Sequence, residues 1–358
     1  MKSAYASISK SALAHNIARL RQQAPNTKLM AMVKANAYGH GMLQIATSLN
    51  HVDALGVARV EEALALREAG VSTEIVLLEG FYTDSNIGAL AAANISTVIH
   101  CEHQLLALEN AKLSQPMKVW VKIDSGMHRL GFSPQQFESL KLRFYQSNNI
   151  QQNPGFMSHF ASADESNQDY TLSQIACFDN CVQGLQGQQS LANSAGIFAF
   201  EQSHRDWIRP GIALYGVSPF AHLSAEDLGL LAVMELRSSL IAVRPHQAGE
   251  SAGYGRIWRS PHDTYLGVVA IGYGDGYPRT APEGTPVRIN GRIVPIVGRV
   301  SMDMLTVDLG PKPMDQVGDE AIIWGAGLPV EDVAKHVGTI GYELVTKLTS
   351  RVPLYYKD

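Results

Sequence analysis

A lysine lies at the end of the first apolar segment of the chain, in a setting that could support amine chemistry. Lys34 follows the apolar run 29–33 and precedes a loop, residues 35–41, that contains Gly39 and Gly41. An amine that is removed from solvent and lies beside other cations has a lowered pKa, so it can act as a nucleophile or form a Schiff base. For a lysine taken alone, an ion pair at the end of a strand is the alternative. The neighbouring residues must therefore decide between a reactive amine and an ion pair.

Several other charged or polar side chains lie at or just after the ends of short apolar segments. These residues are Lys122, Asp124, Arg129, His159 and Ser194, while Arg209 begins the last such unit. In a β/α barrel the C-terminal ends of the strands meet around one pocket, so residues placed in this way can act together with Lys34. Taken singly, Lys122 and Asp124 could be a solvated charge cluster. His159 could be a core histidine, and Arg209 could close a salt bridge at the end of the barrel.

The segments that would carry these residues alternate between short apolar runs and stretches with helical spacing. Eight runs are predicted as strands: residues 29–33, 54–58, 74–78, 96–100, 117–123, 155–160, 191–194 and 208–214. The helix predicted over residues 59–69 is typical of the intervening segments, since Val60, Ala63 and Leu64 share one face and Gly70 can end it in a left-handed conformation. Eight such units predict a closed (β/α)8 barrel of the TIM type.

The pattern changes beyond residue 230, where strand-like runs are joined by tight turns. Residues 285–300 contain the pair Asn290-Gly291, which suits a type I′ hairpin turn. Helical spacing returns in residues 329–337 and 343–350. The sequence therefore predicts an α/β barrel in residues 1–229, followed by a mainly β domain in residues 230–358.

Composition and charge argue against several classes of protein. The net charge is −4 and no run of Lys and Arg could neutralise a stretch of phosphates, so we expect no nucleic-acid partner. The N-terminus leads into a helix-like pattern without the apolar core of a signal segment, and no apolar stretch is long enough to cross a membrane. We therefore expect a cytoplasmic protein. Cys101, Cys177 and Cys181 are too few for a disulfide framework and no metal-binding set surrounds them, so we expect free thiols and no metal.

Several motifs, in the same order along the chain, resemble those of the alanine racemases, which are pyridoxal-phosphate enzymes built from a barrel and a β domain. The motifs are residues 33–41, 121–131, 158–161, 209–216 and 272–276. The resemblance implies a homodimer that interconverts L- and D-alanine by a two-base mechanism. Such a reaction could supply D-alanine for peptidoglycan or degrade it, and the sequence does not separate the two roles.

The same resemblance implies which residues exchange protons. Lys34 would bind pyridoxal phosphate covalently and then act as a base on one face of the substrate Cα. Tyr254, in Gly253-Tyr254-Gly255, would be the opposing base, supplied by the partner subunit, and His159 would link it to Arg209. Considered alone, a tyrosine between glycines is more often a packed turn residue.

Arg209 would lie against the pyridine nitrogen of the cofactor. Because a guanidinium does not give up its proton, the nitrogen would stay unprotonated and the ring would be a weaker electron sink, which suppresses side reactions. Arg129 would contact the substrate carboxylate and the phenolic oxygen of the cofactor. Lys122 matches a lysine that is carbamylated in many members of the family and that positions this arginine.

The remaining implied contacts hold the phosphate and shape the entrance. The phosphate would be bound by the side chains of Tyr38, Ser194 and Tyr342 and by the backbone of Gly211 and Ile212. Met302 of the partner subunit would meet the substrate carboxylate through its backbone amide. Tyr273 and Tyr342 would narrow the entrance so that it admits a methyl side chain. Residues 272–276 follow a predicted strand and precede no helix pattern, which indicates a turn rather than a nucleotide loop.

Three alternatives compete with this interpretation. A decarboxylase of the same architecture usually works with a cysteine in the β domain, whereas all three cysteines here precede residue 182. A non-catalytic pyridoxal-phosphate carrier of the single-barrel kind lacks the second domain. A broad-spectrum racemase is typically exported, which the missing signal segment disfavours. Ser301, and the order of small residues in Ser194-Ala195-Gly196, depart mildly from some members and bear on fine substrate preference.

Overall fold

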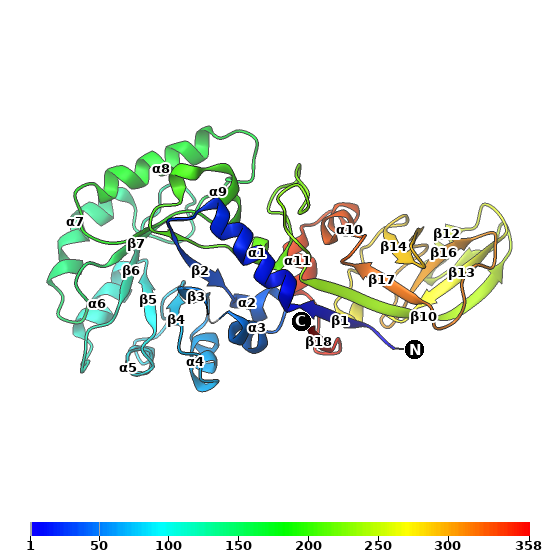
Figure 1. Ribbon diagram of the computed structural model, residues 1–358, viewed down its shortest axis with the longest axis horizontal. Helices are drawn as coiled ribbons and strands as arrows, with labels where there is room; N and C mark the ends of the chain where they lie inside the picture. Colours follow the sequence, from blue (N-terminus) through cyan, green and yellow to red (C-terminus); the bar gives the residue numbers. More distant parts are fainter. Residues whose placement is uncertain (1, 50) are drawn as a thin grey trace.

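The first part of the molecule is a closed barrel of eight parallel strands, which confirms the predicted fold class. The computed structural model describes residues 2–49 and 51–358. The strands follow one another around the barrel in chain order: β2 (Lys28–Met32), β3 (Ala54–Val57), β4 (Glu74–Leu77), β5 (Ser96–Ile99), β6 (Val119–Lys122), β7 (Gly155–Met157), β8 (Gln189–Ser190) and β9 (Trp207–Ile208) (Figure 1). Strand β9 closes the barrel by pairing with β2, with Lys28 opposite Trp207.

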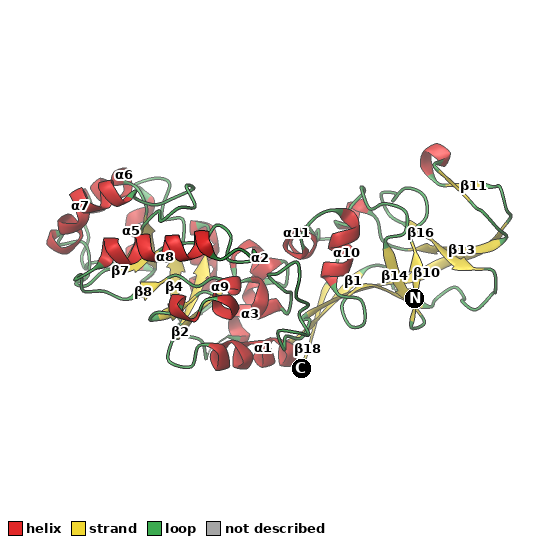
Figure 2. Ribbon diagram, turned by 90° about the horizontal axis from the view of Figure 1, so that it is seen from above, coloured by secondary structure: helices red, strands yellow, loops and turns green. Residues whose placement is uncertain are grey.

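Helices cover the outside of the barrel between these strands (Figure 2). They are α1 (Lys10–Gln23), α3 (Met42–Ser48), α4 (Val60–Glu68), α5 (Asn86–Ala92), α6 (Glu102–Asn110), α7 (Pro134–Gln146), α8 (Asp169–Val182) and α9 (Ser194–Ala199). Helix α7 begins at a capping box, in which the Ser133 hydroxyl accepts the Gln136 N–H and the Gln136 side chain accepts the Ser133 N–H. Local sequence signals therefore place this helix.

The barrel interior is filled by side chains from β2 to β7 and from β9. The inner cluster consists of Met30, Met32, Ala54, Val76, Val98, Trp120, Met157 and Trp207. The Trp120 and Trp207 rings meet edge to face at 5.9 Å, and a Cβ at Gly155 would come within 2.4 Å of the Trp120 ring, so only glycine fits there. A packed interior leaves the strand ends as the place for chemistry.

Three of the predicted strands are wrong at their ends. The strand expected over 155–160 ends at Met157, so His159 lies beyond it. Residues 191–194 were expected as a strand, but β8 is Gln189–Ser190 and Ser194 is the first residue of α9, because the Asn193 side chain accepts the Gly196 N–H and caps that helix. The strand expected over 208–214 ends at Ile208. Pro210 cannot donate to a ladder, and Ile212–Tyr215 form a 3₁₀ turn.

The second part of the molecule is built mainly from antiparallel strands. These are β10 (Met234–His246), β13 (Thr264–Val269), β14 (Pro286–Ile289), β15 (Arg292–Pro295), β16 (Leu305–Gly310) and β17 (Glu320–Trp324), with the small pair β11 (Ser251–Ala252) and β12 (Trp258–Arg259). Two short helices, α10 (Val330–Val337) and α11 (Gly341–Thr346), lie near the two segments predicted as helical. Asn290 and Gly291 both have positive φ, 47° and 79°, which confirms the type I′ turn between β14 and β15.

The first residues of the chain form a strand of the second sheet. Strand β1 (Tyr5–Ser9) pairs antiparallel with β10 and parallel with β18 (Leu354–Lys357), between the two parts of the molecule (Figure 1). The sequence had indicated a helix-like pattern from the N-terminus, and α1 begins only after Ser9, whose hydroxyl accepts the Ala12 N–H. The division near residue 230 stays a prediction. Among the described residues no helix is long and apolar enough to cross a membrane.

Candidate functional site

Lys34 begins a left-handed helical turn at the C-terminal end of β2. The turn, α2 (Lys34–Tyr38), contains four consecutive non-glycine residues, 35–38, with φ between 52° and 55°. Each such residue costs roughly 1–2 kcal/mol relative to a right-handed conformation, so the surroundings must hold the turn in place. A strained turn of this kind at a strand end is a mark of a functional site.

Three hydrogen-bonding side chains hold this turn. Glu62 of α4 accepts the Ala35 N–H at 2.8 Å, and the Asn36 side chain accepts the Met42 N–H at 2.8 Å. The His40 Nδ1 lies 3.1 Å from the Ala37 carbonyl and 2.9 Å from the Tyr38 carbonyl, so it donates to both. The Lys34 amine therefore emerges from a fixed backbone.

Four cations surround the mouth of the barrel at this point. Burial lowers the pKa of Lys34, and Arg129 and Arg209 lower it further, against the opposing effect of Glu79. Burial also lowers the pKa of Lys122 to about 8, assisted by Arg209, Arg129 and Lys34. Two amines in this site therefore lose their protons more readily than ordinary lysines.

Arg209 is fully fixed by hydrogen bonds to neutral acceptors. Its Nη1 donates to the Ser190 hydroxyl at 2.6 Å, and its Nη2 donates to the carbonyls of Ser158 at 2.6 Å and Leu191 at 3.3 Å. Burial lowers the pKa of this guanidinium to about 10, which still leaves it protonated at neutral pH. Within residues 2–49 and 51–358 none of its hydrogen-bond acceptors is a carboxylate.

His159 is half-buried beside the same cations, and its lowered pKa keeps the imidazole neutral. Burial drives its pKa well below the ordinary value, and Arg209 and Lys122 add to the effect. The backbone carbonyl of His159 accepts from the Gln174 side chain at 3.1 Å. In the described part of the chain the His159 ring makes no hydrogen bond to Arg209, so the implied link between them stays a prediction.

Hydroxyl groups and backbone amides converge at one side of the site. The Ser194 hydroxyl accepts the N–H groups of Gly211 at 2.9 Å and Ala213 at 3.3 Å, and it keeps its own hydrogen for donation. Burial raises the pKa of Tyr38 to about 12, so its hydroxyl also stays protonated. A Cβ at Gly211 would come within 2.4 Å of the Tyr38 hydroxyl oxygen, so glycine is required for this approach. This set of protonated hydroxyls and backbone amides suits the binding of a phosphate anion.

The second part of the molecule contributes Tyr342 to this side of the site. Tyr342 lies on α11, and its ring centroid is 6.2 Å from that of Tyr38. Burial raises its pKa, so this hydroxyl is also a neutral donor. The structure thus brings together the predicted residues Lys34, Tyr38, Lys122, Arg129, His159, Ser194, Arg209, Gly211, Ile212 and Tyr342 at one end of the barrel.

Three predicted residues are exposed at the surface of the single chain. Tyr254 is 68% exposed in a 3₁₀ turn that directly follows β11, and β11 lies at the end of the molecule opposite the barrel (Figure 2). Met302 is 52% exposed and Tyr273 is 37% exposed. The predicted turn is a 3₁₀ turn, Tyr273–Asp275, whose Gly274 N–H donates to the Met302 carbonyl at 2.8 Å. This turn packs against the segment after α11, where the Thr349 N–H donates to the Asp275 carbonyl at 3.1 Å.

Sequence reasoning missed several residues that shape the site. Glu62 is the third residue of α4 and accepts the Arg59 N–H at the start of that helix, but its bond to Ala35 depends on the fold. Glu79 follows β4 and opposes the lowering of the Lys34 pKa. The Tyr215 hydroxyl donates to the Met32 carbonyl at 2.8 Å, and its ring stacks on that of Tyr38 at 5.1 Å.

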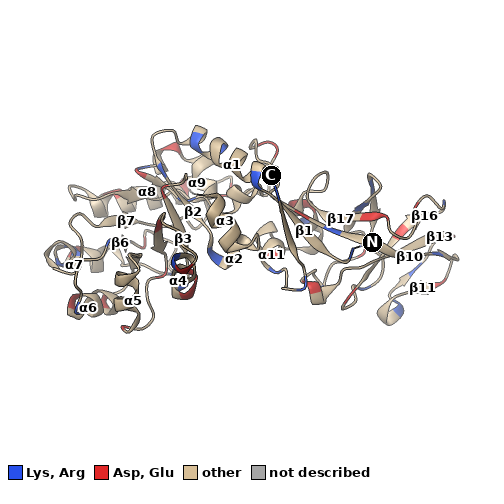
Figure 3. Ribbon diagram, turned by 60° about the horizontal axis from the view of Figure 1, so that its bottom comes forward, with Lys and Arg blue, Asp and Glu red and all other residues tan. Residues whose placement is uncertain are grey.

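Charges elsewhere on the molecule form no single basic face in the view of Figure 3. Basic and acidic segments occur in both parts of the chain, and the start of α2 is basic while the neighbouring α4 carries acidic residues. The cluster formed by Lys34, Lys122, Arg129 and Arg209 is therefore a local feature of the barrel mouth, and it is not part of a larger basic surface in this view.

Comparisons with known proteins agree on one family. The models for the N-terminal and C-terminal domains of alanine racemase match residues 8–219 and 233–356. The alanine racemase of Vibrio cholerae is 58% identical over 356 residues, covering 99% of each chain, and that of Vibrio vulnificus is 58% identical over 358 residues, covering 100% of each.

Solved structures give the same result. The biosynthetic alanine racemase of Pseudomonas aeruginosa superimposes with a TM-score of 0.97 at 44% identity, over 100% of both chains. An alanine racemase from Bartonella henselae with covalently bound pyridoxal phosphate gives a TM-score of 0.89 at 30% identity, over 100% of both chains. The chain therefore belongs to the alanine racemase family of isomerases.

Proposed function

We propose that this protein interconverts L- and D-alanine, with pyridoxal phosphate bound through Lys34 and with two bases on opposite faces of the substrate Cα. The observation that carries the proposal is the environment of Lys34, a partly buried amine of lowered pKa fixed by a strained turn beside a set of neutral hydroxyls. The relative with covalently bound pyridoxal phosphate supports the choice of cofactor.

The residues at the barrel mouth fit this cofactor. Tyr38, Ser194 and Tyr342, with the amides of Gly211 and Ile212, would hold its phosphate, since the Gly211 cradle and the protonated hydroxyls suit an anion. When bound, the cofactor supplies delocalisation of the negative charge that forms at Cα. Arg209 would face its ring nitrogen and keep its own proton, which limits that delocalisation.

Lys34 acts as the base on one face, because its lowered pKa makes the amine lose its proton more readily than an ordinary lysine does. Arg129 binds the substrate carboxylate. Lys122 positions Arg129 as a carbamate, which forms when its neutral amine adds carbon dioxide and releases a proton. A pKa of about 8 makes enough of the neutral amine available near neutral pH.

The opposite face is served by Tyr254 of the partner subunit in a homodimer, with His159 linking it to Arg209. The exposure of Tyr254, and its position far from the barrel of its own chain, support this arrangement. Met302 of the partner subunit would present its backbone to the substrate carboxylate, and Tyr273 would narrow the entrance together with Tyr342. The reaction would supply D-alanine for peptidoglycan or degrade it. A cytoplasmic location stays a prediction from the sequence.

Hydrogen exchange in deuterium oxide tests the proposal. Both enantiomers of alanine should exchange the Cα hydrogen. Lys34→Ala should abolish racemisation and the visible absorbance of the bound cofactor, whereas Lys28→Ala, at the start of the same strand, should leave both intact. Tyr254→Phe should impair exchange from one enantiomer far more than from the other, and Tyr355→Phe is the matched control, as another exposed tyrosine. Full racemase activity in the Lys34→Ala protein would overturn the assignment.

A side-by-side assay with alanine, serine and larger amino acids tests the substrate. Alanine should react fastest because two tyrosines narrow the entrance. Release of carbon dioxide from any of these substrates would point instead to a decarboxylase, although Cys101, Cys177 and Cys181 all lie in the barrel part of the chain.

A further inference from the structure

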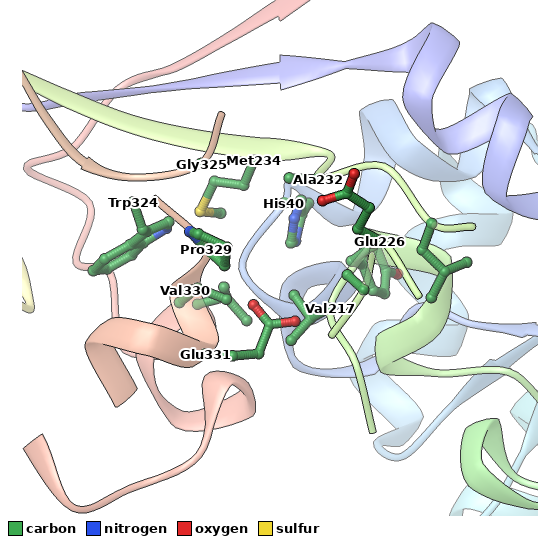
Figure 4. Close-up of a pocket in the computed structure, with 15 residues that line it drawn as sticks. His40, Val217, Glu226, Ala232, Met234, Trp324, Gly325, Pro329, Val330 and Glu331 are labelled. Carbon is green, nitrogen blue, oxygen red and sulfur yellow. The ribbon is translucent and has the colours of Figure 1, made fainter. Parts of the chain in front are cut away.

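A cavity of about 120 Å³ lies where the barrel meets the second part of the molecule (Figure 4). Its walls come from the end of the Lys34 loop, from the segment after β9, and from the segment between β17 and α10. They are mainly apolar, with Val217, Leu230, Met234 and Val330 among them. None of the residues assigned above to substrate or cofactor lines this cavity, so it is separate from the proposed active site.

His40 presents an unpartnered nitrogen to the cavity. The residue is only 1% exposed, and Nδ1 is committed to the carbonyls of Ala37 and Tyr38. Nδ1 must therefore carry the ring hydrogen, while Nε2 makes no hydrogen bond to any residue that the structure describes. Burial lowers the pKa of the imidazole to about 4, so Nε2 is a lone-pair acceptor at neutral pH.

Glu331, near the start of α10, is the second acceptor. One carboxylate oxygen accepts the Ser218 N–H at 2.7 Å, and Figure 4 shows the carboxylate directed into the space below His40. No ion pair of Glu331 is found within residues 2–49 and 51–358. Burial raises its pKa, which reflects the cost of keeping a carboxylate out of water without a cation. Glu226 adds a second negative charge at the rim.

We propose that this cavity binds a small organic ammonium ion. A charged N–H donor satisfies the Glu331 carboxylate and the His40 Nε2, both of which can only accept, and the apolar walls accommodate a short hydrocarbon body. The volume suits about five non-hydrogen atoms, since a cavity of similar size can hold one benzene molecule. A free amino acid is disfavoured because its own carboxylate would meet Glu331 and Glu226.

The occupied cavity would contact the imidazole that holds the Lys34 turn. The His40 ring stacks on Tyr215 with centroids 4.4 Å apart, and Tyr215 stacks in turn on Tyr38. The inference rests on the cavity and its acceptors and does not depend on the proposed racemase activity.

Binding of pyrrolidinium to the full-length holoenzyme tests this inference. Pyrrolidinium is a secondary ammonium with two N–H donors, and it does not replace Lys34 in a stable Schiff base. Titration calorimetry and saturation-transfer NMR should show one saturable site per chain. Glu331→Gln should weaken binding about tenfold or more, because a charge-assisted hydrogen bond is lost. Asp332→Asn, on the adjacent residue of α10, should bind as the parent protein does.

A second probe separates hydrogen bonding from charge. Tetramethylammonium has the same charge and no N–H donor, so its affinity should be lower by about tenfold. The inference fails if pyrrolidinium shows no saturable binding, if Glu331→Gln binds it unchanged, or if a crystal soaked in pyrrolidinium shows only water in the cavity.

Discussion

Lys122 illustrates how burial and neighbouring cations alter a single residue. Its pKa is lowered to about 8 from an ordinary value of 10.5, so the folded protein holds this proton less tightly than the unfolded chain does. Below pH 8 the proton is present in both states, and it costs the folded state free energy. As pH rises from 8 to 10.5 that cost disappears, and the contribution of Lys122 to stability improves by roughly 3 kcal/mol.

We therefore expect Lys122→Met to raise the apparent free energy of unfolding at pH 7 and to flatten its rise between pH 8 and 10.5. Urea titrations at a fixed protein concentration, in buffer purged of carbon dioxide, measure this difference. Lys28→Met is the control, and it should keep the pH dependence of the parent protein. An unchanged profile in Lys122→Met would contradict the interpretation.

Residue types and motifs predicted many of the residues that meet at the mouth of the barrel, but they did not predict the hydrogen bonds between them. Lys34 could be placed because it follows an apolar run, and Arg209 because it begins the last predicted βα unit. Their partners could not, because Ser158 and Ser190 meet the Arg209 guanidinium only after two other strands have taken their places in the barrel. Glu62 reaches Ala35 from the next helix for the same reason.

The left-handed turn at α2 shows how one element depends on another. Gly39 follows the turn with φ of 82°, and a Cβ there would lie 1.9 Å from the Val345 carbonyl oxygen of α11. Gly291 has a similar φ of 79°, but nothing lies within 4 Å of its added Cβ. A comparison of substitutions at Gly39 and Gly291 therefore separates the energetic cost of backbone strain from that of steric collision.

Gly291→Ala should cost about 1 kcal/mol of stability, from the strained backbone alone. Gly39→Ala should cost about 3 kcal/mol or more, because the backbone of α11 must also move. It should also weaken cofactor binding, measured by the absorbance of pyridoxal phosphate on titration. Equal losses in the two variants would show that the contact with Val345 is unimportant.

At this scale the sequence predicted the type of most elements and erred at their ends. An apolar run such as residues 191–194 is compatible with a strand, and only the cap at Asn193 shows that a helix begins there. The Asn290-Gly291 turn was predictable because its conformation is set by the two residues themselves.

The whole molecule separates the two proposed bases. Lys34 lies at the barrel and Tyr254 at the opposite end of the same chain (Figure 2). Sequence order gives no sign of this separation, because it appears only when the barrel and the second sheet are placed in space.

Mixed dimers test whether the site is shared between chains. A dimer of one Lys34→Ala chain and one Tyr254→Phe chain has one site with both residues intact and one with neither. Random exchange of subunits between the two inactive proteins should therefore restore about one quarter of the parent activity. Mixing Lys34→Ala with itself provides the control. No recovery, with subunit exchange verified by mass spectrometry, would contradict a shared site.

The position of β1 has a consequence for synthesis on the ribosome. Ile8 pairs with Met234 and Ala6 with Leu354, so the first strand of this sheet waits for partners made more than 200 residues later. At about 5–20 residues per second, translation leaves that strand without partners for roughly ten seconds or more. The barrel that follows it has emerged by then, so a nascent chain carries an unpaired strand beside a completed barrel and offers chaperones a defined place to bind.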